Sequence, residues 1–279
     1  MIHLVTDSTS DLTGLRDTAL GVRVVPLTVR FGEEQFRDGV DLTSREFYQR
    51  LADSSVNPTT SQPAPQAFVD VFHELLRPDD HIVSLHIAQQ LSGTLQSATL
   101  AARDVDEARI FPIDSGTVSV GLQLLIEAAA RDIAAGADLS TVLHNIEERK
   151  ARICTYVLLD TLTYLQRGGR IGRAQAMLGG MLKVKPLLRV EAGEVHPQGK
   201  VRSRTQGIEA LVELAKSGNP IEAMGVMHAD APDAGTRLRE RLVAEFPGMD
   251  ASLGELGPVV GTYTGGGALG FACMTAAAG

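Results

Sequence analysis

The sequence predicts an α/β protein of two domains, an N-terminal parallel-sheet α/β/α domain over residues 1–155 and a C-terminal α+β domain over 156–279. Three observations lead to this prediction. In the first half, β-rich apolar segments alternate with segments of helical periodicity, which is typical of a parallel sheet with helices on both faces. In the second half, hairpins are mixed with helices. The chain of 279 residues is also long enough for two cores.

Strands of the first half are predicted from short runs rich in β-branched and apolar residues, at 1–6, 22–31, 81–87 and 109–113. Helices are predicted where apolar residues recur every three or four positions, at 43–52, 65–76, 92–103, 117–136 and 139–151. Thr43 and Glu46 have the spacing of a capping box. Ser92 is expected to open the helix that follows it.

The pattern changes after residue 153, and the second half is expected to combine sheet and helix differently. Strands are predicted at 153–159, 223–228, 251–256 and 258–263, with a hairpin formed by 187–190 and 194–202. Helices are predicted at 174–182, 205–217 and 233–246, and a final helix is expected after the glycine-rich segment 265–270. We therefore expect a change of domain between residues 150 and 160.

Composition favours a cytoplasmic protein without stable membrane insertion. Apolar stretches such as 121–130 are interrupted by polar residues and are far shorter than the roughly 20 residues of a membrane span. The N-terminus begins directly with a predicted strand and lacks the features of a signal peptide. Cys154 and Cys273 both have apolar neighbours, which favours buried thiols over a disulfide and a reducing compartment.

Charge is unevenly distributed along the chain. The net charge of −8 argues against general affinity for nucleic acid or for anionic membranes. Between Gln166 and Arg204, however, nine basic residues face only Glu191 and Glu194, so this segment carries +7 and the rest of the chain −15. Such a segment is either a solvated face or a patch for an acidic or phosphate-bearing partner.

Two short motifs predict a site for a small anion. One is Thr-Thr-Ser-Gln-Pro at 59–63, with Thr60 and Ser61, and the other is Leu-Ser-Gly-Thr at 91–94, with Ser92 and Gly93. Both motifs place hydroxyls and free backbone N–H groups where the chain is expected to run into a helix, and helix N-termini stabilise anions. Either turn alone is also explained by ordinary helix capping.

No motif predicts a cofactor, a metal or a catalytic nucleophile. The segment 265–270 fits G-x-G-x-x-G, but only nine residues follow it, so the second strand and the ribose-binding acid of a dinucleotide site are missing. The seven histidines lack the spacing of metal ligands. Asp7 follows a predicted strand as an aspartyl-phosphate nucleophile would, but without the second aspartate two residues later. The sequence thus predicts a site that holds an anion without transforming it.

The chain resembles the DegV family of fatty-acid-binding proteins over its whole length. The resemblance depends on five motifs in the family's order and spacing: Asp-Ser-Thr-Ser-Asp-Leu at 7–12, the motifs at 59–63 and 91–94, Arg-Gly-Gly-Arg-Ile at 167–171, and Gly-Thr-Tyr-Thr-Gly at 261–265 with the glycines that follow. It implies two domains with one long-chain fatty acid, similar to palmitate, between them.

The resemblance also implies roles for individual residues. Thr60 and Ser92 would hydrogen-bond the fatty acid's carboxylate, with Ser61, Gly93, Tyr263 and Gly265 beside them. In relatives that serve a fatty acid kinase, the bound acid is presented to a separate kinase subunit, and Arg170 and Arg202 would face that partner. The last motif usually has a histidine and a proline where this chain has Tyr263 and Gly266.

Two alternatives belong to other functional classes. The chain could be an enzyme that hydrolyses or transfers a small phosphorylated substrate, or a binding protein for a short anionic metabolite. Four apolar residues are candidates for the wall of a lipid tunnel, although core packing would explain them equally well: Met177, Leu178, Met181 and Leu182.

Overall fold

The computed structural model describes residues 1–12, 19–180 and 184–277, and its first layer is a four-stranded parallel sheet. The strand order is β2-β1-β6-β7, and every neighbouring pair is parallel. The strands are β1 (Ile2–Asp7), β2 (Val22–Val25), β6 (His81–His86) and β7 (Ile110–Asp114). Polar turns follow the carboxyl ends of β1, β6 and β7, which is where ligands of such sheets bind.

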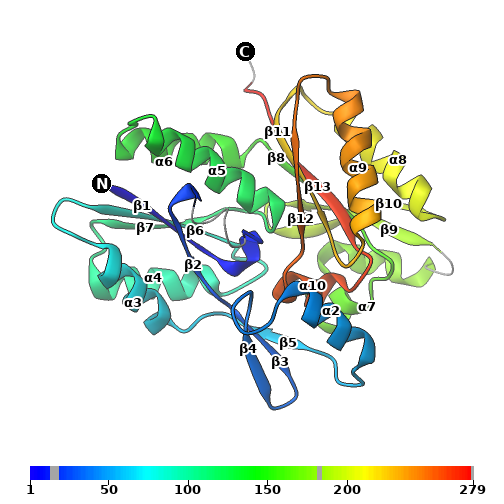
Figure 1. The fold of residues 1–279 in the computed structure, drawn as a ribbon, viewed down its shortest axis with the longest axis horizontal. Helices are drawn as coiled ribbons and strands as arrows, with labels where there is room; N and C mark the ends of the chain where they lie inside the picture. The colour runs from blue at the N-terminus through cyan, green and yellow to red at the C-terminus, as the bar shows by residue number, and fades with distance from the viewer. Residues whose placement is uncertain (13–18, 181–183, 278–279) are drawn as a thin grey trace.

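Helices cover both faces of this sheet (Figure 1). On one face lie α3 (Pro65–Leu75) and α4 (Thr94–Val105), which bury Phe68, Phe72 and a row of alanines. On the other face lie α5 (Val120–Ala134) and α6 (Leu139–Lys150). The short 3₁₀ helix η1 (Ser8–Ser10) follows β1. The predicted α/β/α arrangement of the first half is confirmed.

A small antiparallel sheet sits beside the parallel sheet and corrects one prediction. The segment 22–31 is two strands rather than one, because Pro26 has no N–H to continue the ladder. β2 stays in the parallel sheet, whereas β3 (Thr28–Phe31) pairs with β4 (Glu34–Arg37) and β5 (Thr59–Ser61). The 59–61 segment is thus an edge strand rather than a turn. Helix α2 (Ser44–Asp53) begins with the predicted capping box of Thr43 and Glu46.

The second half contains a six-stranded mixed sheet with the order β10-β9-β8-β13-β11-β12. All its pairs are antiparallel except β11 with β12. The strands are β8 (Ile153–Leu158), β9 (Lys185–Glu191), β10 (Glu194–Val201), β11 (Ile221–His228), β12 (Ala251–Glu255) and β13 (Leu269–Thr275). Helices α8 (Arg204–Lys216) and α9 (Pro232–Glu245) cover one of its faces.

Three predictions for the second half are wrong. Residues 258–263 belong to helix α10 (Pro258–Thr264) instead of a strand, with Pro258 in the first turn. The expected final helix is strand β13, and the glycine-rich segment therefore leads into a strand. The helix expected at 174–182 is a 3₁₀ helix, η2 (Gly172–Gly180), preceded by α7 (Thr163–Arg167), and residues 181 and 182 lie outside the described part of the chain.

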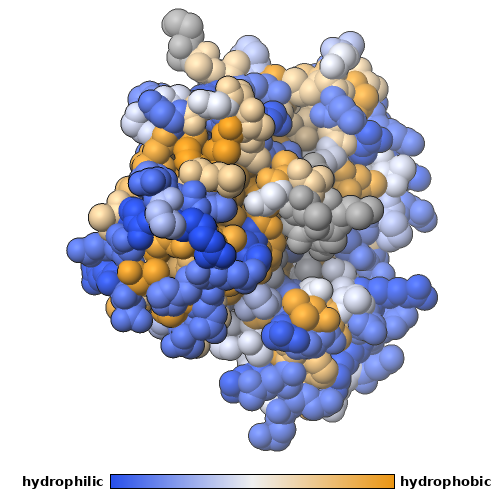
Figure 2. Space-filling model, turned by 60° about the vertical axis from the view of Figure 1, so that its left-hand side comes forward, coloured by the Kyte–Doolittle hydropathy of each residue, from blue (hydrophilic) through white to orange (hydrophobic). Residues whose placement is uncertain are grey.

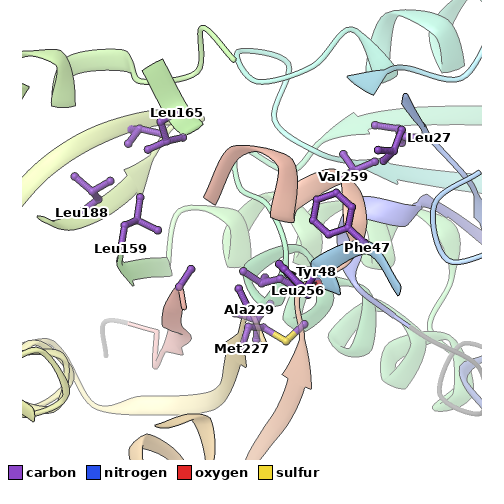
Figure 3. Packing of buried hydrophobic residues seen from close by; sticks show 14 of the residues in the cluster. Leu27, Phe47, Tyr48, Leu159, Leu165, Leu188, Met227, Ala229, Leu256 and Val259 are labelled. Atoms are coloured by element: carbon purple, nitrogen blue, oxygen red, sulfur yellow. Dashed lines mark hydrogen bonds between the residues drawn. The ribbon is translucent and has the colours of Figure 1, made fainter. Parts of the chain in front are cut away.

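Helix α5 joins the two large sheets. It packs against β1 and β6 of the first sheet and against β8, β11 and β13 of the second. Nine of its residues are buried, including Gly121 and Gln123, as expected for a helix enclosed on most sides. The central hydrophobic cluster contains Val120 and Leu124 of α5 together with residues from α2, α10 and the second sheet (Figure 3).

The outer surface is mixed in character. On the face shown in Figure 2, hydrophilic side chains cover most of the surface and hydrophobic ones appear in smaller patches between them. No helix among residues 1–12, 19–180 and 184–277 is both long and apolar enough to span a bilayer.

Candidate ligand cavity

A cavity of about 380 Å³ lies between the two large sheets. The first half contributes Thr9, Ile87 and Ser92 to its wall, and the second half contributes Val157, Leu188 and others. The cavity therefore exists only where the two halves of the chain meet. Its size is within the range of about 300–1,000 Å³ that is usual for small-molecule sites.

One side of the cavity is a predominantly apolar sheet surface. Thr155, Val157 and Leu159 alternate along β8 and just beyond it, and all three line the cavity. Side chains in a strand point alternately to opposite faces, so this spacing places them on one side of the sheet. Further apolar residues come from β9, β10, β11 and α10: Leu188, Val190, Val195, Met227, Val259 and Val260. This wall suits an aliphatic ligand.

The polar part of the wall begins at Thr60 and Tyr263. Thr60 belongs to β5 and Tyr263 to α10, yet their hydroxyl oxygens lie 2.6 Å apart in a hydrogen bond. Both residues are half-buried and line the cavity, as does Ser61. Since a hydroxyl can both donate and accept, one member of the pair donates to the other, and the second keeps its O–H free to donate to an anion.

The ring of Tyr263 is held by Gly168 and Arg170. Gly168 lies so close that a Cβ there would overlap Tyr263 Cδ1, so only glycine fits. The Arg170 guanidinium lies 5.2 Å from the ring centroid, a cation–π contact. Arg170 also donates from Nε to the Leu91 carbonyl at 3.1 Å and from Nη1 to the Gly168 carbonyl at 2.7 Å. The exposed Arg170 thus links the motif at 167–171 to the motif at 91–94.

Ser92 and Gly93 stand before the N-terminus of α4. Gly93 is the N-cap residue and no side chain caps the first turn, so Ser92 is not the cap that the sequence predicts. Ser92 Oγ instead accepts from the Thr94 N–H at 3.3 Å and lies 2.8 Å from Thr94 Oγ1. The side chain of Gln62 packs directly on Gly93, where a Cβ would overlap it. The structure thereby brings the 59–63 and 91–94 motifs together.

Other predicted residues lie away from the cavity. Gly265 ends α10 with φ +71° and packs against the ring of Tyr164. Arg202 is exposed and does not line the cavity. Met177 and Leu178 pack on the central hydrophobic cluster rather than lining the cavity. Met181 and Leu182 lie outside the described residues.

A fully buried series of hydrogen-bonded side chains, Ser84, His86 and Asp7, lies behind the cavity wall. Ser84 Oγ is 2.7 Å from His86 Nε2, and His86 Nδ1 is 3.0 Å from Asp7 Oδ2. The order Ser–His–Asp is that of a hydrolase triad, but Ser84 is fully buried and does not line the cavity. Asp7 instead accepts from the backbone N–H groups of Thr9 and Ile87, both at 3.0 Å, and so positions two wall residues.

Two more carboxyls, Asp11 and Asp38, are buried close to each other, and Asp11 is bonded to Ser119, a cavity residue. Ser119 donates its hydroxyl to Asp11 Oδ2 at 2.5 Å, and the Gly257 N–H donates to Asp11 Oδ1 at 2.8 Å. Burial raises the pKa of Asp11 to about 8 and that of Asp38 to about 7. Within the described ranges, no three His, Cys, Asp or Glu side chains are grouped so as to hold a metal ion.

Half of the described cations of the basic segment form local ion pairs. Arg173 pairs with Glu194, Arg189 with Glu191, and both Lys185 and Arg204 with Asp160. Among the described residues of this segment, the cations without an ion pair are Arg167, Arg170, Lys200 and Arg202. The free positive charge therefore concentrates on a few positions, of which Arg170 reaches the cavity.

Comparison with known proteins decides the family. The family model described as "Uncharacterised protein, DegV family" matches residues 1–276. The chain belongs to the DegV family. A DegV domain-containing protein of Halalkalibacterium halodurans is 36% identical over 274 residues, covering 96% of each chain. The resemblance seen in the five motifs is thereby confirmed.

Solved DegV structures share the whole fold. A DegV family protein from Thermus thermophilus, described for its fatty acid binding, matches with a TM-score of 0.93 and 36% identity over 99% of each chain. A stearic acid-binding protein from Eubacterium ventriosum matches with a TM-score of 0.91 and 27% identity, covering 99% of this chain and 98% of its own. The α/β fold predicted here is therefore that of the DegV proteins.

The sequence reasoning missed several DegV cavity residues. Thr9, Ser119 and Thr155 line the cavity but belong to no predicted anion site. The period of two along 155–159 is a signal for one face of a strand, but it does not tell which face meets a cavity. Arg170 is predicted from the sequence to face a partner, which stays a prediction; the structure places it in the cavity wall.

Proposed function

We propose that this DegV protein binds one long-chain fatty acid, with the acyl chain along the apolar wall and the carboxylate at Thr60, Ser92 and Tyr263. The observation that carries the proposal is the cavity itself, which is apolar along β8 and β9 and has a hydroxyl pair and an arginine at its polar part. Relatives with the same fold are described as fatty acid or stearic acid binders.

The acyl chain is expected to supply most of the affinity. Burial of a chain of about sixteen carbons is worth on the order of 11 kcal/mol at ~0.8 kcal/mol per methylene, before entropy costs. Each hydrogen bond to a carboxylate adds about 1.5–3 kcal/mol. The tail thus determines how tightly the ligand binds, and the hydroxyls determine which end lies at Arg170.

Mass spectrometry of the purified protein tests the binding proposal. Under native conditions we expect one fatty acid per chain, and the delipidated protein should take up added palmitate. A protein that purifies empty and does not bind palmitate would contradict the proposal. A phosphorylated compound or a short organic acid in its place would favour the alternative classes.

Substitution of the two hydroxyls tests where the carboxylate lies. Thr60→Ala and Ser92→Ala should each weaken palmitate binding by about 1–3 kcal/mol, because a donor to a partly buried charge is lost. Both should weaken the matching C16 alcohol much less, since it has no carboxylate. Equal losses for acid and alcohol would show that these residues act through packing.

We further propose that the bound acid is presented to a separate kinase subunit that phosphorylates its carboxylate. Support comes from the exposed cations Arg170 and Arg202, which have no ion-pair partner among the described residues. Substitution of Arg202 tests the kinase contact separately from ligand binding, because Arg202 does not line the cavity. Arg202→Glu should leave palmitate binding unchanged and slow phosphorylation in a reconstituted kinase assay, through loss of electrostatic steering. An unchanged rate would reject this role.

A further inference from the structure

The two cysteines of the chain face each other across neighbouring strands. Cys154 of β8 is paired in register with Cys273 of β13. Both belong to the hydrophobic cluster under α8 and α9, on the sheet face away from the cavity. They are 119 positions apart in the sequence, so only the fold brings the two thiols together.

The register gives the pair a separation suited to a disulfide. Close to the end of β13, the Thr275 N–H donates to the Arg152 carbonyl at 3.0 Å. In antiparallel strands, directly opposed residues alternate between pairs that exchange backbone hydrogen bonds and pairs that do not. Thr275 and Arg152 are a hydrogen-bonded pair, so Cys273 and Cys154, two residues farther from the strand end, are one as well. Such pairs have Cα atoms about 5.5 Å apart. Disulfides join Cα atoms about 4.4–6.8 Å apart, so the Cα separation of this pair is compatible with a disulfide, and closure needs only that the Cβ atoms approach to about 3.5–4.5 Å.

The two thiols differ in environment and so in chemistry. Their side chains are hydrogen-bonded to each other, and this bond lowers the pKa of Cys154 to about 7 and raises that of Cys273. Cys154 is half-buried, whereas Cys273 is buried and 4% exposed. Cys154 is therefore the thiolate that meets a small oxidant first, since thiolates are the reactive form.

We propose that Cys154 and Cys273 are a reversible redox pair that closes to an intramolecular disulfide when the folded protein meets a peroxide. The Cys154 thiolate attacks one peroxide oxygen, the O–O bond breaks, and Cys154 becomes a sulfenic acid while hydroxide leaves. The sulfur of Cys273 then attacks the sulfenic sulfur, the S–S bond forms, and the S–O bond breaks to release water. Overall two thiols are oxidised and one hydrogen peroxide is reduced to two waters.

The cross-link would fasten the last strand of the fold to its neighbour. β13 lies between β8 and β11 at the centre of the six-stranded sheet. Tyr156 of β8 and Phe271 of β13, two residues from the cysteines and on the same face of the sheet, stack at 5.4 Å, whereas Thr155 and Val157 of β8 face the cavity on the other side. The oxidised pair thus adds a covalent tie to the strands that form this wall.

Oxidation of the folded wild-type protein tests the proposal directly. After treatment with a small excess of hydrogen peroxide, we expect loss of both free thiols, a mass decrease of two hydrogens, and a 154–273 cross-linked peptide in a non-reducing digest. Dithiothreitol should restore both thiols. The same treatment of Cys273→Ser should leave Cys154 as a sulfenic acid that dimedone labels, and Cys154→Ser should remain unlabelled at Cys273.

Three results would overturn the proposal. In the first, both thiols stay free in the folded protein and cross-link only in urea. In the second, Cys154 is oxidised to the sulfinic acid and no cross-link forms. In the third, the disulfide joins two copies of the chain instead of Cys154 and Cys273 of one copy. Because the main measurement uses the wild-type chain, a variant that fails to fold leaves the test intact. The outcome is independent of which ligand fills the cavity.

Discussion

At the scale of single residues, Arg170 and Tyr263 define the polar part of the cavity. Arg170 supplies a fixed positive charge and Tyr263 a hydroxyl, and Gly168 leaves the space that the ring needs. The Tyr263 ring lies directly beside the Arg170 guanidinium. In the binding mode proposed above, Arg170 would attract the carboxylate, and Tyr263 and Thr60 would hydrogen-bond it.

Removal of the Tyr263 hydroxyl should weaken binding of the acid. Tyr263→Phe keeps the ring against Arg170 but loses the 2.6 Å hydrogen bond to Thr60. We expect the palmitate Kd to rise by about 2–10-fold, corresponding to about 0.5–1.5 kcal/mol. Tyr164→Phe is the matched control, because the Tyr164 hydroxyl has no hydrogen-bond partner within the described part of the chain. Calorimetry with palmitate would measure both, and equal effects would contradict the assignment.

Asp38 should make stability depend on pH. Burial raises its pKa from 3.8 to about 7, and its Oδ2 atom has no hydrogen-bond partner among the described residues. A carboxyl with a raised pKa contributes its full stability below the unfolded pKa and loses it as pH rises through the folded value. Between about pH 4 and about pH 7, the free energy of unfolding should fall in the wild type relative to Asp38→Asn, by at most about 1.4 kcal/mol per pH unit.

Urea unfolding at several pH values checks this prediction. Asp41→Asn is the matched control, since Arg37 holds the pKa of the exposed Asp41 at about 2, below the window. The difference between wild type and Asp41→Asn should be constant across the same range. A constant difference for Asp38→Asn as well would show that Asp38 does not titrate there.

At the scale of elements, the predictions for β13 and α10 are wrong because local pattern does not decide the structure of these two segments. β13 is buried along its whole length, so its apolar residues show no alternation, and a short apolar run does not distinguish a strand from a helix. The β-branched residues of 258–263 favour a strand, yet Pro258 at the first turn and packing against α2 make α10 helical. Packing thus overrides local preference in both elements.

The capping box at the start of helix α2, which the sequence predicts correctly, can be tested by mutation. The Thr43 side chain accepts from the Glu46 N–H, and Glu46 accepts from the Thr43 N–H at 3.0 Å. Thr43→Ala should lower the free energy of unfolding by about 1 kcal/mol, because the first turn loses its cap. The double variant Thr43→Ala/Glu46→Ala should lower the free energy of unfolding by less than the sum of the two single variants, since the two side chains act together. Arg45→Ala in the same turn is the control and should change stability by less than about 0.5 kcal/mol.

At the scale of the whole molecule, the cavity depends on how α5 holds the two sheets together. α5 contacts both sheets, and the cavity wall takes residues from each. A ligand that fills this space contacts both halves, so its binding should stabilise the entire chain. The division into domains 1–155 and 156–279 remains a prediction that limited proteolysis would examine.

Fatty acid should raise the unfolding temperature of the delipidated protein. At a free concentration of 100 times Kd, linkage gives about 2.7 kcal/mol, or about 5–10 °C in Tm for a chain of this size. Val157→Trp, which places a large ring in the cavity wall, should fold normally and show no such rise. A rise of equal size in this variant would place the ligand elsewhere.

The sequence by itself determined the fold class, most of the helices, the family and the two hydroxyl motifs. These features are local, because periodicity, capping residues and motif spacing are properties of short segments. Thr60 and Ser92, which line the cavity, could be picked out from the sequence for this reason, since each lies within a short motif of recognisable composition.

Only the tertiary structure decided which residues meet around the cavity. The hydrogen bond between Thr60 and Tyr263 joins residues 203 positions apart, and the register of β8 with β13 joins Cys154 to Cys273. Gly265 packs on Tyr164, away from the cavity, despite its place in a family motif. The reason is physical: contacts between distant segments follow from how the sheets pack on α5, and no local pattern in the chain encodes that packing.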